Sequence, residues 1–579
     1  MTGRYLAVVG GRAALQARAA GDREALHACT TTIVDQPDLQ VLATGDLVAQ
    51  CVPGDRGAVL GSAFPLGSAA ALDARLHHAA PGLDSARSFG GRYWGGYIAI
   101  LRDTVRGGFG VTRGTFGNVP CYYARSGGAV LLASDLDMLS KAGWVAGPIN
   151  WDRLRDYIVF RDLPVPATCI DNVAELRGGT LLSFAEGKLT IEDIWSPWDH
   201  AGRSHWHTGR GDAERAVHDA VMLATKASMQ RASRPLLMLS GGLDSSVLAA
   251  SIAAQGRDFV GFNLSSRGVG DERRYAALVA ERTGARLVEA AWDVGLVDVT
   301  ASAAARLPNP AARNFMQGTN CLLDKAIAQT GSDLVVDGGG GDNVFCSLQS
   351  VGPVLDALLQ GRSMRQAGST ALSIAQLAQV SVSKVAQGAI RRLRRRSAAY
   401  RWHRADGFFR PEVVESLAQP WHPWLERPSD IGIGSAAHVG LIVAAQGWAE
   451  SNDIGGRVPR VSPLASRPVA EACLQVPSWW WFMDGRNRAI ARAAFRERLP
   501  AEIVDRRSKG SPDTHVAELL EANRPVIRAM LLDGRLRANG LLDASALSCA
   551  LDDPAGVQSG DITQIMRLVD VEAWLASRT

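Results

Sequence analysis

The chain has 579 residues, more than one hydrophobic core usually serves, so its length predicts at least two domains. An apolar fraction of 47% and a charged fraction of 21% are typical of a globular protein with a sizeable core. The formal net charge of +4 is too small to indicate a nucleic acid or a membrane surface as a partner.

The cysteine pattern and the absence of long apolar runs indicate the cellular compartment of the protein. Eight cysteines are widely scattered, with no CxxC pair and no grouping with histidine at zinc-ligand spacing, so we expect reduced and mostly buried thiols. Residues 1–20 lack the apolar stretch of a signal peptide, and no later run approaches the roughly 20 uninterrupted apolar residues of a membrane span. The sequence therefore predicts a cytoplasmic protein.

The first third of the chain reads as an antiparallel sheet protein. Short apolar runs alternate with glycine-rich turns, among them RYLAVVG, GRYWGGYIAI, PCYYA and GAVLLASD. The stretch 199–215 is polar and rich in glycine and histidine, which is typical of a linker. We therefore predict one domain over 1–200 and a second over 212–579.

Strand and helix signals alternate after this linker. Apolar strand-like runs at 235–239, 259–266 and 286–292 are separated by helical stretches, and a further run leads into the glycines at 338–341. This alternation predicts a doubly wound, mostly parallel sheet with ligands at the carboxyl ends of its strands.

The stretch PLLMLSGGLDSSVLAA at 235–250 is typical of a strand, a phosphate loop and a helix. Adjacent glycines let the backbone approach a ligand closely, and the free amides of a new helix favour an anion. Neither the Walker loop nor the dinucleotide fingerprint matches. The alternative is a plain Gly-Gly turn, which would leave Ser240, Asp244 and Ser245 without a common role.

A second strand runs into four glycines and ends at Asp342. Asp244 and Asp342 would then lie at the ends of two strands of one sheet. Mg²⁺ takes hard oxygen ligands from one or two carboxylates, phosphates and water, so the pair predicts a magnesium site. The alternative is a glycine-rich surface turn with an exposed aspartate.

The two loops in this order resemble the asparagine synthetase family, and SGGLDSS resembles the pyrophosphate loop of the ATP pyrophosphatases. The resemblance implies ATP and Mg²⁺, with the metal on Asp244 and Asp342. It implies nucleotide contacts from Ser240, Gly241, Gly242, Asp244, Ser245, Asn263 and Gly338.

The order of GRYWGGY, TRGTFGNVPCYY and LLASDL resembles the glutaminase domain of the same family. The expected fold is an α+β glutaminase-like (Ntn-type) sheet sandwich followed by an α/β ATP-pyrophosphatase domain. The family's nucleophilic cysteine follows the initiator methionine, where this chain has Thr2, and no glutamine-binding motif is recognisable around 44–51. Thr2 could itself act as an amino-terminal nucleophile. We expect instead an inactive scaffold.

Later segments continue the resemblance. The stretch 447–468 is similar to the family segment before its R-x-P-F-L-D motif, and within it Glu450 is our candidate base for the attacking amine. Lys509 matches the family's late lysine, although a surface charge would look the same. A helical insertion at about 351–410 carries five arginines between 391 and 396. These arginines form either a solvated helix face or a contact for an acidic partner.

Within the family the chain looks most like a lasso peptide cyclase, because Thr2 disfavours glutamine-dependent asparagine synthesis. A β-lactam synthetase would carry a tyrosine where Gly338 and Gly339 stand, whereas GGGGDN and AESND are shared with the cyclases. The resemblance implies an AMP-forming ligase that closes a macrolactam in a precursor peptide. It also implies a leader-peptide-binding protein and a leader peptidase as partners, with no nucleic acid and no membrane. The alternatives are an amide ligase for a small molecule and a non-catalytic ATP-binding scaffold.

Overall fold

The computed structural model describes residues 3–11, 29–45, 47–73, 83–265, 271–394, 400–451, 456–507, 513–553 and 557–578. Three predicted positions are affected by these limits. Thr2 and Lys509 lie outside the described residues, and for Glu450 only the helix that contains it is described. Of the five arginines of the insertion, Arg395 and Arg396 also lie outside.

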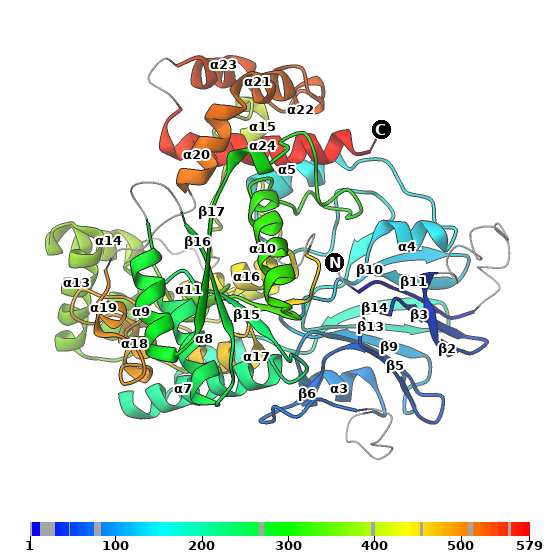
Figure 1. Cartoon of the computed structure of the whole chain (residues 1–579), viewed down its shortest axis with the longest axis horizontal. Coiled ribbons are helices and arrows are strands. Elements are labelled where there is room, and N and C mark those ends of the chain that lie inside the picture. The colour runs from blue at the N-terminus through cyan, green and yellow to red at the C-terminus, as the bar shows by residue number, and fades with distance from the viewer. Residues whose placement is uncertain are drawn as a thin grey trace.

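The amino-terminal part forms two six-stranded sheets, seen at the right of Figure 1. Every pair of neighbouring strands in them is antiparallel, as predicted. The first sheet has the order β12 (Ala174–Glu175), β10 (Tyr122–Ser126), β11 (Ala129–Ala133), β1 (Tyr5–Val9), β3 (Leu39–Ala43), β2 (Thr31–Asp35). The second has the order β14 (Lys188–Asp193), β13 (Thr180–Ala185), β9 (Phe109–Arg113), β8 (Tyr97–Arg102), β5 (Gly57–Gly61), β4 (Ala49–Val52).

Alternating side chains of β1 explain why it lies inside the sandwich. Tyr5, Ala7 and Val9 belong to the core between the two sheets, whereas Leu6 and Val8 belong to the core on the other face. Side chains that alternate across a strand fill two different layers. Both layers are apolar here, so the strand is buried on both faces.

Short elements complete this part of the chain. They are β6 (Phe64–Pro65), α3 (Ala86–Arg92), β7 (Tyr93–Trp94), α4 (Leu136–Lys141), α5 (Trp151–Val159) and α6 (Trp198–Ala201). The predicted linker extended too far, because the next helix, α7 (Arg210–Ser228), already begins inside it. The two parts are connected by the short stretch between α6 and α7.

A five-stranded sheet forms the centre of the second part. Its order is β17 (Arg286–Ala291), β16 (Val260–Ser265), β15 (Pro235–Met238), β18 (Leu334–Val336), β19 (Arg460–Val461), and every neighbouring pair is parallel. The chain order reverses between β15 and β18, and ligands of doubly wound sheets bind at such a switch point. The predicted parallel sheet is therefore confirmed, and its geometry points to the ends of β15 and β18.

Helices cover both faces of this sheet. On one face, α10 (Met316–Thr330) packs Leu323 and Ile327 against Leu236 and Val335. On the other lie α7, α8 (Leu243–Ala254) and α9 (Arg273–Thr283), whose apolar side chains share the large core with Leu237. The central strands β15 and β18 read as continuous apolar runs because both of their faces are covered.

The remaining helices of the second part follow the glycine-rich segment in the chain. They are α11 (Gly341–Val344), α12 (Gly352–Leu359), α13 (Met364–Ala378), α14 (Val382–Arg394), α15 (Pro411–Glu415), α16 (Ile433–Ser451), α17 (Arg467–Leu474), α18 (Ala489–Ala494) and α19 (Ala501–Val504). The carboxyl-terminal group at the top of Figure 1 is α20 (Asp513–Ala522), α21 (Arg524–Leu532), α22 (Arg535–Ala538), α23 (Ala544–Asp552) and α24 (Ser559–Ala576). None of the helices in the described ranges is both long and apolar enough to cross a bilayer.

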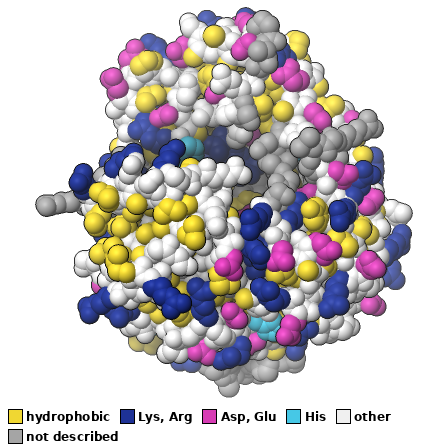
Figure 2. Space-filling view, turned by 90° about the vertical axis from the view of Figure 1, so that its left-hand side faces the viewer, with side chains coloured by type: hydrophobic (Ala, Val, Ile, Leu, Met, Phe, Trp, Pro, Cys, Tyr) yellow, Lys and Arg dark blue, Asp and Glu magenta, His cyan; other side chains and the backbone are white. Residues whose placement is uncertain are grey.

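The predicted insertion is helical and forms α12, α13 and α14. Hydrophobic side chains gather on the face over α13 and α14 (Figure 2), among them the exposed Met364, Leu372 and Ile390. The described arginines of the run lie in the last turn of α14. In the middle of the insertion, Gln376 of α13 packs against Gly485.

Candidate active site

The phosphate loop has the predicted strand, loop and helix geometry. It follows β15, turns at Gly241 with a φ of +68°, and enters α8 through the N-cap residue Gly242. A Cβ on Gly241 would lie 2.4 Å from the Cβ of Tyr275 and 2.6 Å from the backbone nitrogen of Ala276. Position 241 therefore requires glycine both for its conformation and for the close approach of α9.

Hydroxyl groups fix the shape of this loop. Ser240 Oγ and Ser245 Oγ lie 3.2 Å apart, and the Gly242 nitrogen donates to Ser240 Oγ at 3.3 Å. Ser246 Oγ donates to the Gly242 carbonyl at 2.7 Å. Ser240, Gly242 and Ser245 line the large cavity described below. The loop is thus held in shape by its own side chains.

The glycine-rich loop after β18 lies directly against the phosphate loop. A Cβ on Gly338 would lie 2.9 Å from the Ser245 nitrogen, and one on Gly341 would lie 2.6 Å from Asp244 Cγ. A Cβ on Gly339 would lie 1.5 Å from Cη2 of Trp448. The glycines are therefore needed because the loop has no room for side chains where it passes α8 and α16.

The two predicted metal ligands converge on one cation. Nη1 of Arg488 donates to both carboxylate oxygens of Asp244 at 3.3 Å and to Oδ1 of Asp342 at 2.6 Å. Arg488 is the N-cap residue of α18 and has a φ of +56°. Sequence reasoning did not identify it, because it stands far along the chain in a stretch without a recognisable spacing.

The carboxylate pair fits a magnesium ion that also binds phosphate oxygens, since both groups are hard oxygen donors aimed at one position. The guanidinium of Arg488 occupies that position. Among the described residues no group of three or more His, Cys, Asp or Glu side chains could hold a metal. A metal here would therefore depend on the two aspartates together with the ligand.

A third carboxylate lies in the same loop and was not predicted. Asp337 Oδ1 accepts from the Gly339 nitrogen at 2.9 Å and from Ser462 Oγ at 2.6 Å, and Arg460 Nε lies 3.7 Å from Oδ2. These bonds tie the glycine-rich loop to β19. Asp337 therefore positions the loop that carries Asp342.

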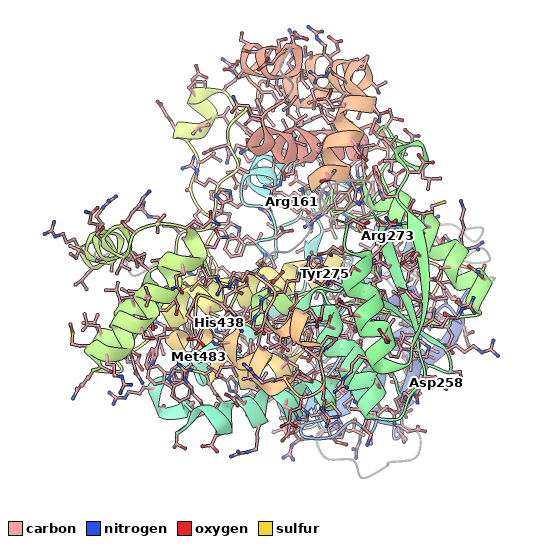
Figure 3. All side chains as sticks on the ribbon, turned by 60° about the vertical axis from the view of Figure 1, so that its left-hand side comes forward. Arg161, Asp258, Arg273, Tyr275, His438 and Met483 are labelled. Carbon is pink, nitrogen blue, oxygen red and sulfur yellow. The ribbon has the colours of Figure 1, made fainter. Side chains whose placement is uncertain are left out.

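A cavity of about 600 Å³ opens between the two loops. Phe262 and Leu264 of β16, Trp448 of α16 and residues of α10 form its walls. The amino-terminal part contributes one carboxylate, Asp162, whose Oδ1 lies 3.3 Å from Nη2 of Arg313. The side chain of the neighbouring Arg161 lies near the carboxyl-terminal helices (Figure 3) and approaches Asp570 of α24 at 3.8 Å.

Beside the phosphate loop lies a smaller cavity of about 210 Å³ that is lined by arginines. Its positive side chains are those of Arg486, Arg488, Arg492, Arg506 and Arg507. Burial and the neighbouring arginines lower the pKa of Arg492 to about 10. With Asp342 as its one carboxylate among the described lining residues, this arginine cavity is suited to a polyphosphate anion.

Arg506 joins this arginine cavity to the phosphate loop. Its Nη1 donates to the Gly241 carbonyl at 3.1 Å, its Nη2 donates to Glu272 at 2.7 Å, and its guanidinium stacks 3.8 Å above the Tyr275 ring. Lys509 follows three positions later, outside the described residues.

Asn263 and Gly241, two of the predicted nucleotide contacts, do not line either cavity. The Asn263 side chain is buried, and its Nδ2 donates to the Leu239 carbonyl at 2.8 Å. The amide nitrogen therefore links β16 to the segment after β15, and a nucleotide contact at Asn263 stays a prediction. Gly241 faces α9 for the reason given above. Gly338 and Asp244 do line the large cavity.

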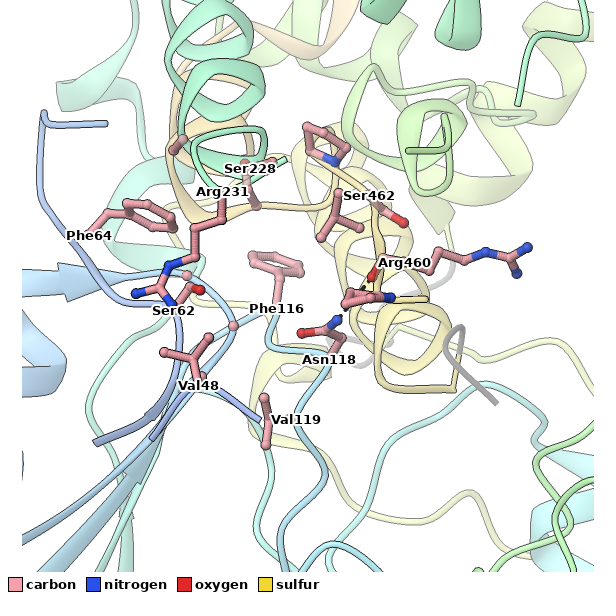
Figure 4. Close-up of a pocket in the computed structure, with 18 of the residues that line it drawn as sticks. Val48, Ser62, Phe64, Phe116, Asn118, Val119, Ser228, Arg231, Arg460 and Ser462 are labelled. Carbon is pink, nitrogen blue, oxygen red and sulfur yellow. Dashed lines mark hydrogen bonds between the residues drawn. The ribbon is translucent and has the colours of Figure 1, made fainter. Parts of the chain in front are cut away.

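A third cavity, of about 360 Å³, lies between the two parts of the chain (Figure 4). Ser62, Phe64 and Phe116 come from the sandwich, and Arg231 comes from the segment after α7. Nδ2 of Asn118 donates to the Arg460 carbonyl at 3.0 Å, which closes one side. Gly3 lies in the wall, and the described lining contains no cysteine.

Comparison with known proteins gives two family matches. The chain matches the family described as asparagine synthase over residues 216–576, and the family described as glutamine amidotransferase domain over residues 87–195. The search of curated proteins found no match.

Two solved structures are similar at low identity. One is titled as the allosteric regulatory enzyme of purine biosynthesis, with 10% identity, a TM-score of 0.21, and coverage of 50% of this chain and 80% of that one. The other is glutamine phosphoribosylpyrophosphate amidotransferase from B. subtilis complexed with ADP and GMP, with 11% identity, a TM-score of 0.19, and coverage of 59% and 77%. At these scores neither structure carries an argument about this chain.

Proposed function

We propose, from the premise that this chain belongs to the asparagine synthase family of ATP-dependent amide ligases, that it closes a macrolactam ring in a ribosomally made precursor peptide. The observation that carries the proposal is the convergence of Asp244 and Asp342 on one cation position beside the phosphate loop. This arrangement suits the activation of a carboxylate by ATP. The finer assignment, to the lasso peptide cyclases, rests on the sequence resemblance.

In the first step an oxygen of an Asp or Glu side chain of the peptide attacks the α-phosphorus of ATP. The bond from that phosphorus to the bridging oxygen of the β-phosphate breaks, and pyrophosphate leaves with the electron pair. The amides at the start of α8 and the arginine cavity bind the phosphates and the leaving group. Mg²⁺ held by Asp244 and Asp342 would neutralise charge on the phosphates.

In the second step the α-amine of the same peptide attacks the acyl carbon. The bond from that carbon to the AMP oxygen breaks, an amide forms, and the amine gives up a proton. Holding the amine against the acyl-adenylate supplies a proximity effect of about 7–11 kcal/mol in ideal cases. We propose Glu450 as the base and Lys509 as the cation that stabilises charge on the departing AMP.

Trp448 lines the large cavity and stands two positions before Glu450 on α16. Residues two positions apart on a helix do not share a face, so this neighbour does not argue for Glu450, and the choice of Glu450 rests on the sequence resemblance. The choice of Lys509 rests on the resemblance as well; Arg507, two positions before it, lines the arginine cavity.

The proposal favours an amine from the substrate over ammonia from glutamine. Thr2 stands where the resemblance places the family's cysteine, and the described wall of the cavity that Gly3 lines has no cysteine. The ring of Trp448 fills the space over Gly339, at the position where a β-lactam synthetase would carry a tyrosine. An amide ligase acting on a small molecule is the second candidate, and a scaffold that binds ATP without turnover is the third.

The test is ATP–pyrophosphate exchange with linear candidate peptides, followed by mass analysis of the product. A cyclised peptide weighs one water less than its linear form, and one AMP should appear for each ring. Asp244→Asn and Asp342→Asn should each abolish the exchange in a folded protein.

Two further results decide among the alternatives. Exchange with free amino acids and with no peptide would favour the small-molecule ligase, and no exchange with any carboxylate would favour the scaffold. Release of ammonia from glutamine that disappears in Thr2→Ala would contradict the inactive amino-terminal domain. In the proposed enzyme, Thr2→Ala leaves cyclisation as it is.

A further inference from the structure

A groove leaves the large cavity along one side of α10. Ala303, Gln317 and Asn320 line both the cavity and the groove, so the two spaces are continuous. The groove has a volume of about 510 Å³. It passes Cys321, Asp324, Lys325, Ala328 and Arg457.

The helix period explains why α10 can serve as both a core helix and a groove wall. Leu323, Ala326 and Ile327 pack against the parallel sheet. The groove residues recur on the opposite face, over three turns from Gln317 to Ala328. At about 1.5 Å per residue this face is about 16 Å long. About five residues of an extended chain cover that length.

The lining is mostly polar and mixed in charge, with alanines among longer side chains. Asp324 is balanced by Lys325 and Arg457, and the alanines at both ends leave room for a backbone. Burial raises the pKa of Asp324, with Arg457 acting in the opposite direction. A groove of this kind does not suit a phosphate chain, which needs an excess of positive charge, nor an apolar ligand. It suits an extended peptide, whose backbone offers donors and acceptors in alternation.

Gln317 keeps the entrance of the groove in shape. Its Nε2 donates to the carbonyls of Asp298 at 2.9 Å and Ala301 at 3.0 Å, and its Oε1 accepts from the Asp298 nitrogen at 3.1 Å. The amide is therefore held between α10 and the segment that carries Ala303. The passage from cavity to groove is consequently part of the rigid fold.

We propose that the α10 groove binds, as an extended chain, the residues of the precursor peptide that adjoin the activated Asp or Glu. The inference rests on the proposed function and makes it more specific. A cavity of about 600 Å³ is of the size that encloses a single ligand of nucleotide size. The activated residue lies within a longer peptide chain, so the residues next to it in the peptide must leave the cavity. The groove provides such an exit, because it shares lining residues with the cavity.

The first test compares two neighbouring positions on α10. Ala328→Trp fills the far end of the groove, whereas Gln329→Trp adds the same side chain at an exposed position that does not line it. The substrate is the linear peptide that supports exchange, used whole and with five residues removed on either side of the activated one. Ala328→Trp should raise the KM of the whole peptide about tenfold or more and remove its advantage over one truncated form.

The outcomes separate this inference from the proposed function. If Gln329→Trp retains the preference for the whole peptide and Ala328→Trp loses it, the groove is the binding site. If the wild-type protein cyclises the peptide and Ala328→Trp binds it with the wild-type KM, the groove inference is wrong and the function stands. If no peptide supports exchange, both fall.

A second measurement does not depend on a substituted protein. Cys321 lies in the middle of the groove and is partly exposed, and Cys549 is an exposed thiol outside it. The whole peptide together with a non-hydrolysable ATP analogue should slow alkylation of Cys321 about tenfold or more relative to Cys549. Equal alkylation of Cys321 with and without the peptide, at a concentration that saturates exchange, would overturn the inference.

Discussion

Replacing Arg488 by alanine tests how the two loop carboxylates are balanced. The side chains of Arg488 and Asp244 are each only 9% exposed, whereas that of Asp342 is 41% exposed. Removing one partner of a buried pair costs about 3–5 kcal/mol, because the other charge stays buried and loses a compensating charge. The contact with Asp342 adds less than about 1 kcal/mol, since water screens it. We therefore expect Arg488→Ala to lower the free energy of unfolding by about 3 kcal/mol.

Magnesium provides the specific readout. In Arg488→Ala the two carboxylates still converge, and a divalent cation can replace the guanidinium. A ligand that binds only the folded protein stabilises it by about 2.7 kcal/mol at 100 times its dissociation constant. The melting temperature of Arg488→Ala should therefore rise with MgCl₂ by several degrees more than that of the wild type.

The matched control is the double variant Asp244→Asn with Arg488→Ala, which lacks one metal ligand. It should melt at the same temperature with and without MgCl₂. Thermal unfolding followed by fluorescence at constant ionic strength measures all three proteins. An equal magnesium response in the wild type and in Arg488→Ala would refute the reasoning, because Arg488 would then not compete for the metal position.

Two further predictions concern the neighbourhood of the glycine-rich loop. Gly339→Ala should abolish exchange activity, because the new Cβ would lie 1.5 Å from the Trp448 ring. Adding Trp448→Ala to this variant should restore part of the activity. Equal activity of the single and the double variant would contradict the packing argument. Burial lowers the pKa of His438 to about 4 from 6.5, so the neutral ring contributes stability above pH 6.5 that is lost as the pH falls from 6.5 towards 4. His438→Gln, which can still donate to the Val344 carbonyl, should flatten this part of a stability curve measured by urea unfolding between pH 4 and 7.5, and an unchanged slope would contradict the assignment.

The sequence predicted the parts of the site that depend on local backbone requirements. The turn at Gly241 and the glycine-rich loop after β18 can be recognised in the sequence, because only glycine fits at these positions. The strand and helix alternation predicted the parallel sheet for a similar reason, since each element has its own apolar period. Such signals are contained in a few consecutive residues.

Contacts between distant segments could not be predicted in the same way. Arg488 reaches Asp244 from a part of the chain 244 positions away, and Asp162 reaches the large cavity from the amino-terminal part. For Asn263 the structure shows a contact that the sequence did not indicate, because its amide donates to the Leu239 carbonyl. Both faces of a central parallel strand are buried, so its sequence does not tell which side chains reach a ligand and which hold a neighbouring strand.

The arginine that bridges the aspartates also borders the arginine cavity, so it links the carboxylate pair to that cavity. If a metal takes the carboxylates, Arg488 must leave them, and a free guanidinium among four other arginines is unfavourable without an anion. A polyphosphate in the arginine cavity provides that anion. The charges of the described residues therefore favour joint arrival of metal and polyphosphate over either one alone. A bound metal without phosphate would leave the Arg488 guanidinium between two sources of positive charge, the metal ion on one side and the other arginines of the cavity on the other.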